Sequence, residues 1–164
     1  MRLLGLLFVT LAFTAAGPPT WLTFRNDGIS IRHPPSWFAT TRQLTPVDYP
    51  PQVLAVASFR FPKDTRPNGC KPEGTLAVMP PSGALIFVIE YAYARARDFP
   101  QRPVHFRLGS ARRYECFGPR RSYLLRFREA GRFFQIDVAF GRRAGAGTRA
   151  TVLGVLDSFK ARAR

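Results

Sequence analysis

The sequence predicts an α+β domain built on a twisted, mainly antiparallel sheet of about five to seven strands that helices cover. Three stretches carry this expectation. Residues 84–94 are almost continuously apolar, residues 121–140 have the pattern of a long hairpin, and residues 148–162 carry apolar side chains at helical spacing. Because a strand that is apolar on both faces must be covered on both, the class is mixed rather than all-β.

The N-terminal residues have the features of a secretory signal. Arg2 is followed by a short apolar run, then by the small residues Thr14-Ala15-Ala16 and a Gly-Pro-Pro turn. The apolar run is shorter than the about 20 residues of a membrane span. We therefore expect residues 1–16 to be a signal peptide and residues 17–164 to form a single domain. The protein is then secreted or extracytoplasmic, and membrane-associated if the signal stays uncleaved.

A hairpin is expected at the start of the domain. Residues 21–25 alternate weakly, and residues 29–33 alternate clearly between apolar and polar side chains. Between them stands Asn26-Asp27-Gly28, a strong signal for a two-residue turn. The second strand should end at Pro34-Pro35.

The next segment is expected to alternate between loops and one strand. Residues 36–40 favour a short helical turn that anchors Trp37 in the core. Residues 45–52 form a Pro-rich loop, and residues 53–61 put alternate apolar side chains on one strand face. Residues 62–83 contain many prolines and should be mostly irregular.

The middle of the chain contains the predicted central strand. Residues 84–94 combine Val, Ile, Phe and Tyr, which favour sheet over a buried helix. Residues 95–103 are charged and form a loop. Short strands are expected at residues 104–108 and 114–117.

The clearest supersecondary unit is a hairpin over residues 121–140 that turns at Ala130-Gly131. Its pairing should set Phe127 opposite Phe134 and put both apolar rows on the core side, whereas a one-residue slip would expose one row. The rows are Arg121, Tyr123, Leu125 and Phe127 on one strand, and Phe134, Ile136, Val138 and Phe140 on the other.

A C-terminal helix is expected after the loop 141–147. Thr148 is the predicted N-cap, and Lys160 and Arg162 in the last turn suit the negative end of the helix dipole. Its apolar stripe consists of Val152, Leu153, Val155, Leu156 and Phe159.

The chain is strongly basic, with a net charge of +15, and nearly all of its cations are arginine. Such a surface attracts anionic membranes, polymers and nucleic acid. For an exported protein we expect anionic lipid or an acidic wall polymer rather than nucleic acid. The alternative is a solvated basic surface with no dedicated partner.

Cys70 and Cys116 are the two cysteines. In an oxidising compartment an even pair predicts a disulfide, which would stabilise the fold by about 4 kcal/mol in the chain-entropy view. The alternative is two unpaired thiols. Two cysteines alone do not make a zinc site.

Two stretches of this chain resemble PsbP-like domains. Residues 24–37, F-R-N-D-G-I-S-I-R-H-P-P-S-W, are similar to the opening of that family, and residues 152–159 are similar to its terminal helix. The resemblance covers both ends of the mature chain. It implies an α-β-α sandwich with a twisted antiparallel sheet, in accessory or binding proteins that lack catalysis. The matched positions belong to core and turns, so the resemblance assigns no site residue.

One glycine-rich segment raises the question of a nucleotide site. Gly145 to Ala150 fits G-x-G-x-x-A, but it follows a hairpin strand, and neither a returning strand nor the required acidic residue comes after it. A candidate anion site remains at this helix start, against the alternative of a solvated loop. Its residues would be Arg142, Arg143, Thr148 and Arg149.

Titratable side chains indicate little catalysis. His33 and His105 lack further ligands at metal spacing, and His33 lies near Ser30, Ser36 and Asp27 without the elbow motif of a hydrolase. The carboxylates within strands are expected to pair with arginines rather than to act as an acid–base pair. These are Glu90, Glu115 and Asp137.

The sequence therefore predicts an exported, non-catalytic accessory or binding domain that acts at the cell surface through an Arg-rich face on a protein or anionic partner. We expect no cofactor, metal or catalytic residue. Two alternatives stay open. One is a small secreted hydrolase with a site near His33 or His105, and the other is an electrostatic binder of anionic lipid or cell-wall polymer.

Overall fold

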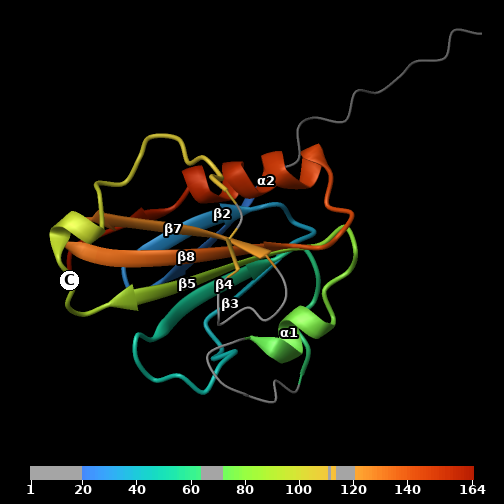
Figure 1. Ribbon diagram of the computed structural model, residues 1–164, viewed down its shortest axis with the longest axis horizontal. Coiled ribbons are helices and arrows are strands. Elements are labelled where there is room, and N and C mark those ends of the chain that lie inside the picture. Colours follow the sequence, from blue (N-terminus) through green and yellow to red (C-terminus); the bar gives the residue numbers. More distant parts are fainter. Residues whose placement is uncertain (1–19, 64–71, 111, 114–120) are drawn as a thin grey trace, which may run out of the picture.

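The computed structural model describes residues 20–63, 72–110, 112–113 and 121–164. They form two antiparallel sheets and one long helix, so the fold is mixed α+β and mostly sheet (Figure 1). The helices are α1 (Glu73–Ala77), the 3₁₀ turn η1 (Ala96–Asp98) and α2 (Ala146–Asp157). The strands are β1 (Leu22–Asn26), β2 (Ile29–His33), β3 (Phe38–Thr40), β4 (Gln52–Ala57), β5 (Ala84–Tyr91), β6 (Arg112–Arg113), β7 (Arg121–Glu129), β8 (Arg132–Phe140) and β9 (Lys160–Ala161).

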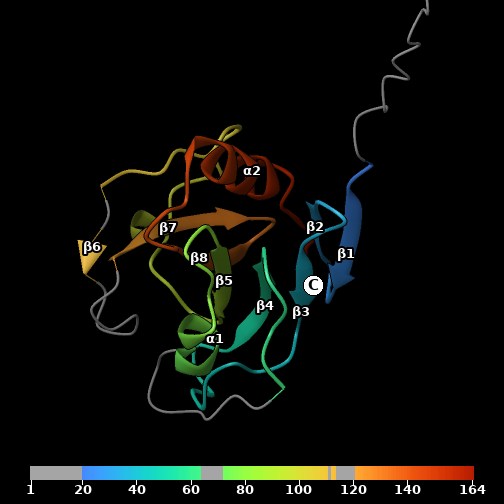
Figure 2. The same cartoon turned by 90° about the vertical axis from the view of Figure 1, so that its right-hand side faces the viewer.

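The two sheets divide the strands unequally. The larger sheet has the order β3-β4-β5-β8-β7-β6, and the smaller has the order β1-β2-β9. Figure 2 shows α2 on one side of the larger sheet, α1 on the other, and the β1–β2 hairpin flanking it. None of the helices that the structure describes is long and apolar enough to cross a membrane.

Strand β5 is the buried centre that the sequence predicts. Ala84, Ile86 and Val88 face the main core, which also contains α2 and β2 residues. Leu85 and Phe87 face a second cluster on the opposite side of the sheet. Its other members come from α1 and the residues just after it, and from alternate positions of β4 and its continuation: Leu76, Met79, Ala55, Ala57 and Phe59. The apolar run of β5 thus serves two cores, because adjacent side chains of a strand point to opposite faces.

The β7–β8 hairpin has the predicted register. Phe127 lies opposite Phe134, and their ring centroids are 5.5 Å apart. Phe159, just beyond α2, packs its ring 5.3 Å and 5.0 Å from these two rings. Ala130 and Gly131 turn the chain with φ of 52° and 77°. This left-handed pair matches the twist of the two strands.

The N-terminal hairpin is also confirmed. Strands β1 and β2 pair around Asp27 and Gly28, which have φ of 44° and 72°. Trp37 is buried as expected, but the helical turn over 36–40 is wrong. Phe38–Thr40 instead pairs with β4, because the edge of that buried strand offers the backbone hydrogen bonds that a short turn lacks.

Two further expectations need correction. Residues 104–108 are irregular rather than a strand, because the Phe106 amide donates to Asp157 Oδ1 at 2.7 Å instead of to a neighbouring strand. The strand over 53–61 ends at Ala57. There Ser58 Oγ accepts a hydrogen bond from the Ala84 amide at 2.9 Å.

The C-terminal helix is shorter and earlier than predicted. It begins at Ala146 with Gly145 as N-cap, while Thr148 donates to the Ser82 backbone oxygen at 3.4 Å. It ends at Asp157, so Lys160 and Arg162 do not lie in its last turn. Ser158 Oγ instead accepts a hydrogen bond from the Arg32 amide at 2.8 Å, which directs the chain along β2 as strand β9.

Several expectations concern residues outside the described ranges. They are the signal peptide 1–16, the strand 114–117, Glu115, and the disulfide between Cys70 and Cys116. They stay predictions.

Candidate functional site

The three-stranded sheet separates apolar from basic side chains by simple alternation. Ile29, Ile31 and His33 of β2 are buried against the core, so Ser30 and Arg32 point outward. The register places Arg25 of β1 and Lys160 of β9 on either side of Ser30. We call this surface the outer face. It consists of Arg25, Ser30, Arg32, Lys160 and Arg162.

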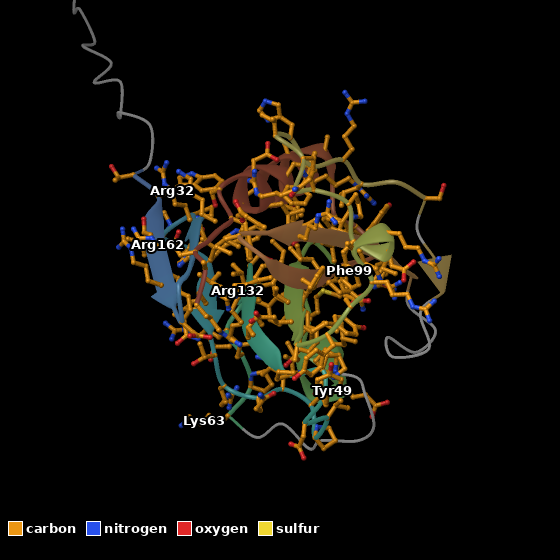
Figure 3. All side chains as sticks on the ribbon, turned by 90° about the vertical axis from the view of Figure 1, so that its left-hand side faces the viewer. Arg32, Tyr49, Lys63, Phe99, Arg132 and Arg162 are labelled. Carbon is orange, nitrogen blue, oxygen red and sulfur yellow. The ribbon has the colours of Figure 1, made fainter. Side chains whose placement is uncertain are left out.

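The four cations of the outer face are exposed and unpaired. Within the part of the chain that the structure describes, their side chains make no hydrogen bond, ion pair or ring contact. Figure 3 shows Arg32 and Arg162 on the β1–β2 side of the molecule. The buried Arg132 lies beneath them and donates to the Arg162 backbone oxygen at 3.4 Å. Like charges held near one another without a counter-charge create a positive potential that an anion relieves.

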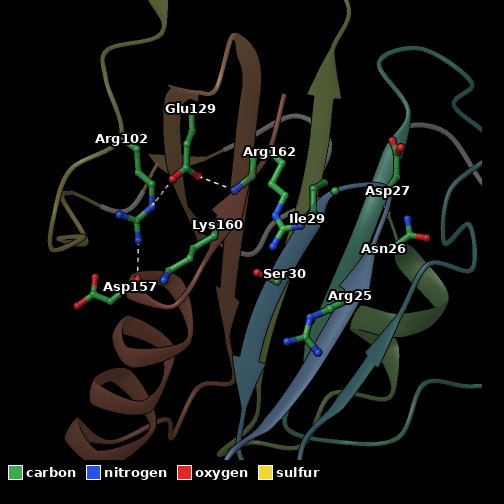
Figure 4. A pocket seen from close by; sticks show the side chains of 12 residues that line it. Arg25, Asn26, Asp27, Ile29, Ser30, Arg102, Glu129, Asp157, Lys160 and Arg162 are labelled. Atoms are coloured by element: carbon green, nitrogen blue, oxygen red, sulfur yellow. Dashed lines mark hydrogen bonds and ion pairs between the residues drawn. The ribbon is translucent and has the colours of Figure 1, made fainter. Parts of the chain in front are cut away.

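A groove of about 640 Å³ adjoins this face, with Arg25, Lys160 and Arg162 in its lining (Figure 4). Its other wall contains Arg102 and Glu129. Arg102 donates to the Asp157 backbone oxygen at 2.5 Å and lies 3.9 Å from Glu129 Oε1. Glu129 Oε2 also accepts a hydrogen bond from the Ala161 amide at 2.9 Å. The groove lining also contains the carboxylates of Asp27 and Asp157. Asp157 accepts a hydrogen bond from the Phe106 amide and lies 3.0 Å from His105 Nδ1, and Asp27 contacts Arg164. Each of the three acids of the groove thus has a partner other than the cations of the outer face.

A buried ion pair lies close to the same sheet. Arg132 donates twice to Glu90, with both distances 2.7 Å, so the predicted pairing of Glu90 with arginine is confirmed. These hydrogen bonds raise the pKa of Arg132. Arg164 contacts Glu90 at 3.2 Å and Asp27 at 2.6 Å, and its hydrogen bond and charge lower the pKa of Asp27. These two carboxylates already have cationic partners of their own.

Among the described residues, Asp137 makes no bridge to an arginine, although the sequence predicts one. It is buried on β8, and Gln135 donates to its Oδ2 at 3.1 Å. Its Oδ1 is a buried atom without a hydrogen bond among the described residues. Burial raises the pKa of Asp137 to about 7, against the smaller opposing effects of Gln135 and Arg126. Arg126, on the neighbouring strand β7, contacts Gln135 instead: its Nε donates to Gln135 Oε1 at 3.0 Å.

The candidate anion residues at the start of α2 differ in their surroundings. Arg142 and Arg143 are exposed. Arg149 instead donates to the Tyr123 hydroxyl at 2.9 Å and lies over the Phe140 ring at 4.5 Å. The Arg149 guanidinium is therefore already engaged by Tyr123 and Phe140. Anion binding at the start of α2 stays a prediction.

The two histidines have different environments. His33 is buried, and its Nδ1 lies 2.9 Å from the Pro34 backbone oxygen; within the described ranges its ring makes no hydrogen bond to an acid or a nucleophile. His105 is exposed, and its Nδ1 lies 3.0 Å from Asp157 Oδ2. It borders a hollow of about 610 Å³, and the described residues of its lining include no hydroxyl or thiol side chain. Across the described ranges, no group of three His, Cys, Asp or Glu side chains is arranged to hold a metal.

Sequence reasoning did not find the outer face. Alternation in R-N-D-G-I-S-I-R marks Arg25 and Arg32 as outward residues, and K-A-R does the same for Lys160 and Arg162. What joins the two stretches is the pairing of β2 with β9, about 130 positions apart in the chain. The helical spacing of the apolar residues before it predicts Lys160 in the last turn of a helix, and not in a strand paired with β2.

Comparison with protein-family models finds no match to this chain, and comparison with curated proteins finds none either.

Proposed function

We propose that this protein is an exported, non-catalytic accessory or binding domain whose outer face holds an anionic partner at the cell surface. The observation that carries the proposal is the set of four exposed cations on one sheet face, which have no counter-charge among the residues that the structure describes. Exposed cations contribute little to folding. Their interaction energy is therefore available to a ligand.

We further propose that the domain is a PsbP-like α-β-α sandwich. Two features support this. The stretch that resembles the family opening, 24–37, spans the β1–β2 hairpin and Trp37, and the stretch 152–159 includes the end of α2 and Phe159. Accessory and binding roles are what this resemblance implies.

The binding proposal is tested with two variants of equal charge. The outer-face variant combines Arg25→Gln, Arg32→Gln, Lys160→Gln and Arg162→Gln. The control variant combines Lys63→Gln, Arg95→Gln, Arg97→Gln and Arg107→Gln, which are also exposed. Each is titrated with three anionic probes: phosphatidylglycerol vesicles, poly(glycerol phosphate) and polyglutamate.

At least one probe should bind the wild type and lose about 100-fold or more affinity in the outer-face variant, since each lost anion contact weakens binding and lowers its salt dependence. The control variant should lose only a few-fold, through net charge alone. Equal losses in the two variants would show that binding follows net charge and not this face, and would overturn the proposal.

Export is tested separately. Expressed with its own N-terminus in a secreting host, the protein should appear outside the cytoplasm with the mass of a chain cleaved near Ala16. Alkylation without and with reductant should then show Cys70 and Cys116 protected only before reduction. Retention of full-length protein in the cytoplasm would contradict export.

A second candidate, a small secreted hydrolase, has one observation in its favour. The 3.0 Å contact between His105 and Asp157 resembles the base–orienter pair of hydrolases. If this candidate is right, a panel of ester substrates should reveal turnover that His105→Ala abolishes and His33→Ala does not. Turnover that is the same in wild type and His105→Ala would exclude it.

A further inference from the structure

We infer that the anionic partner is a linear, base-free phosphodiester polymer, of the alditol-phosphate kind, that lies across the outer face and its groove. This inference rests on the proposed function and specifies its ligand class. Three features of the outer face support it: the spacing of the cations, the chemistry of their side chains, and, in the described part of the chain, the lack of exposed large apolar or aromatic residues among them.

The spacing suits a chain of charges rather than one small anion. Neighbouring strands lie about 4.8 Å apart, so Arg25 and Lys160, on either side of Ser30, have Cα atoms about 10 Å apart. Arg162 follows Lys160 by two residues, or about 7 Å, and Arg32 follows Ser30 by the same step. The cations thus extend over several neighbouring positions in two directions. A flexible polymer with a charge every several ångströms can meet them in turn.

The side chains favour phosphate over carboxylate. Three of the four cations are arginines, whose planar guanidinium donates two hydrogen bonds to one phosphate. Ser30 lies between Arg25 and Lys160, and its hydroxyl has no hydrogen bond within the described ranges. A guanidinium can pair with a carboxylate in the same way, but a carboxylate is planar whereas a phosphodiester is tetrahedral. The charged oxygens of the phosphodiester therefore also accept from outside the plane of the guanidinium, where the Ser30 hydroxyl can donate.

A membrane surface fits less well. The exposed large hydrophobic residues of the described chain are Leu22, Tyr49, Val78, Tyr93 and Val104. None of them belongs to the outer face, because Leu22 pairs with His33 and so shares the inward row. Surface helices and loops that enter a bilayer insert apolar side chains beside their cations. A groove also suits a polymer chain better than a flat layer of headgroups.

Nucleic acid fits less well for a similar reason. Proteins that hold single strands stack bases on exposed aromatic rings. Phe24 shares the inward row, opposite Ile31. Trp21 is half-buried, and its ring lies so close to Gly154 that a Cβ there would be 2.9 Å from Cη2. The outer face therefore offers cations without a stacking platform.

The test compares four probes on the wild type, the outer-face variant and the control variant. They are poly(glycerol phosphate), polyglutamate of the same length and charge, phosphatidylglycerol vesicles, and an oligothymidylate of the same charge. Poly(glycerol phosphate) should bind the wild type about 10-fold more tightly than each of the others. Its slope of log affinity against log salt should fall by about 3 in the outer-face variant, at about 0.7 per lost cation.

Ser30→Ala gives a finer readout. It should weaken poly(glycerol phosphate) a few-fold and leave polyglutamate binding nearly unchanged, because a tetrahedral phosphodiester can accept a hydrogen bond from outside the plane of a bound guanidinium and a planar carboxylate directs its lone pairs within that plane. Circular dichroism of this variant checks that the sheet is intact. Equal weakening of both probes would contradict the role of the hydroxyl.

The outcomes separate the two proposals. If polyglutamate, vesicles or oligothymidylate bind as tightly as poly(glycerol phosphate), and the outer-face variant loses that binding, the ligand class is wrong and the binding function stands. If no probe distinguishes the outer-face variant from the control variant, the binding function itself is wrong.

Discussion

Two groups of charges on neighbouring parts of this protein have opposite environments. Arg132 and Glu90 are buried and joined by two hydrogen bonds of 2.7 Å. The cations of the outer face lie on the adjacent small sheet, exposed and without partners in the described chain. The same residue type, arginine, occupies both settings.

The difference separates charges that the fold needs from charges that a ligand can use. A buried charge must be paired, because its desolvation costs several kcal/mol. An exposed charge keeps its water and adds little to stability. Abundant arginine in a sequence therefore does not indicate a binding site until the structure shows which guanidinium groups are already engaged.

The largest effect is expected at the buried pair. Arg132→Ala leaves Glu90 buried with only the longer contact to Arg164, and the free energy of unfolding should fall by about 3 kcal/mol or more. Urea unfolding followed by tryptophan fluorescence measures this. Arg132→Met combined with Glu90→Leu should recover most of the loss, since no charge then remains buried. A loss below about 1 kcal/mol in the single variant would show that the fold does not need this buried pair.

Asp137 extends the comparison to a buried acid without a cation. Its pKa is raised in the fold, so the folded state holds a proton that the unfolded state releases. Stability from this residue is complete below about pH 4 and is lost as pH rises to about 7, where both states are ionised. The Asp137→Asn variant has no ionisable group at this position, so its stability does not fall in this way as pH rises. Between pH 4 and 8, the stability of the variant relative to wild type should rise by about 4 kcal/mol.

The measurement for Asp137 is a series of urea unfolding curves across that pH range. Asp48→Asn, at an exposed carboxylate, is the matched control and should show no such trend. A constant difference between the Asp137→Asn variant and wild type at all pH values would mean that the acid ionises normally in the fold.

Arg164 stands between the two extremes, because it is exposed but contacts both Asp27 and Glu90. Arg164→Gln should lower the thermal midpoint by about 2 °C or less. The pKa of Asp27 is lowered in the fold, so the part of this effect that involves Asp27 is present at neutral pH and disappears as pH falls below about 4. Thermal unfolding at pH 7 and pH 3 tests this, and an equal shift at both would contradict it.

The smallest effect on stability is expected for the outer-face variant. Removing four exposed like charges should change the free energy of unfolding by no more than about 0.5 kcal/mol, with a slight gain from reduced repulsion. Calorimetry measures the shift. A loss above about 2 kcal/mol would show that these cations have structural partners.

The elements that could be predicted are those whose side-chain pattern and turn agree. In β7–β8 the two apolar rows and the Ala130-Gly131 turn admit one register, and a slip by one residue would expose a row. In β1–β2 the Asp27-Gly28 turn has the same role. The burial of β5 was predictable because its residues 84–89 are apolar without interruption, and such a strand must be covered on both faces.

The elements that could not be predicted depend on distant partners. Phe106 is apolar and in an alternating stretch, but its amide bonds to the side chain of Asp157, 51 residues away, and no strand forms. Helix α2 ends at Asp157 because Ser158 bonds to the Arg32 backbone, 126 residues away. Neither contact leaves a signal in the neighbouring sequence. The helical spacing of apolar residues therefore predicted a helix that continued beyond its actual end at Asp157.

By itself, the amino-acid sequence determined the class of fold, the two hairpins with their register, the buried central strand and a large excess of arginine. Alternation and turn residues act between near neighbours, so they can be read along the chain. The tertiary structure alone decided which arginines are neutralised and which are free. The pairing of β9 with β2 placed Lys160 beside the β1–β2 hairpin. Whether a charge is paired depends on neighbours that are distant in sequence, and only the folded chain brings these together.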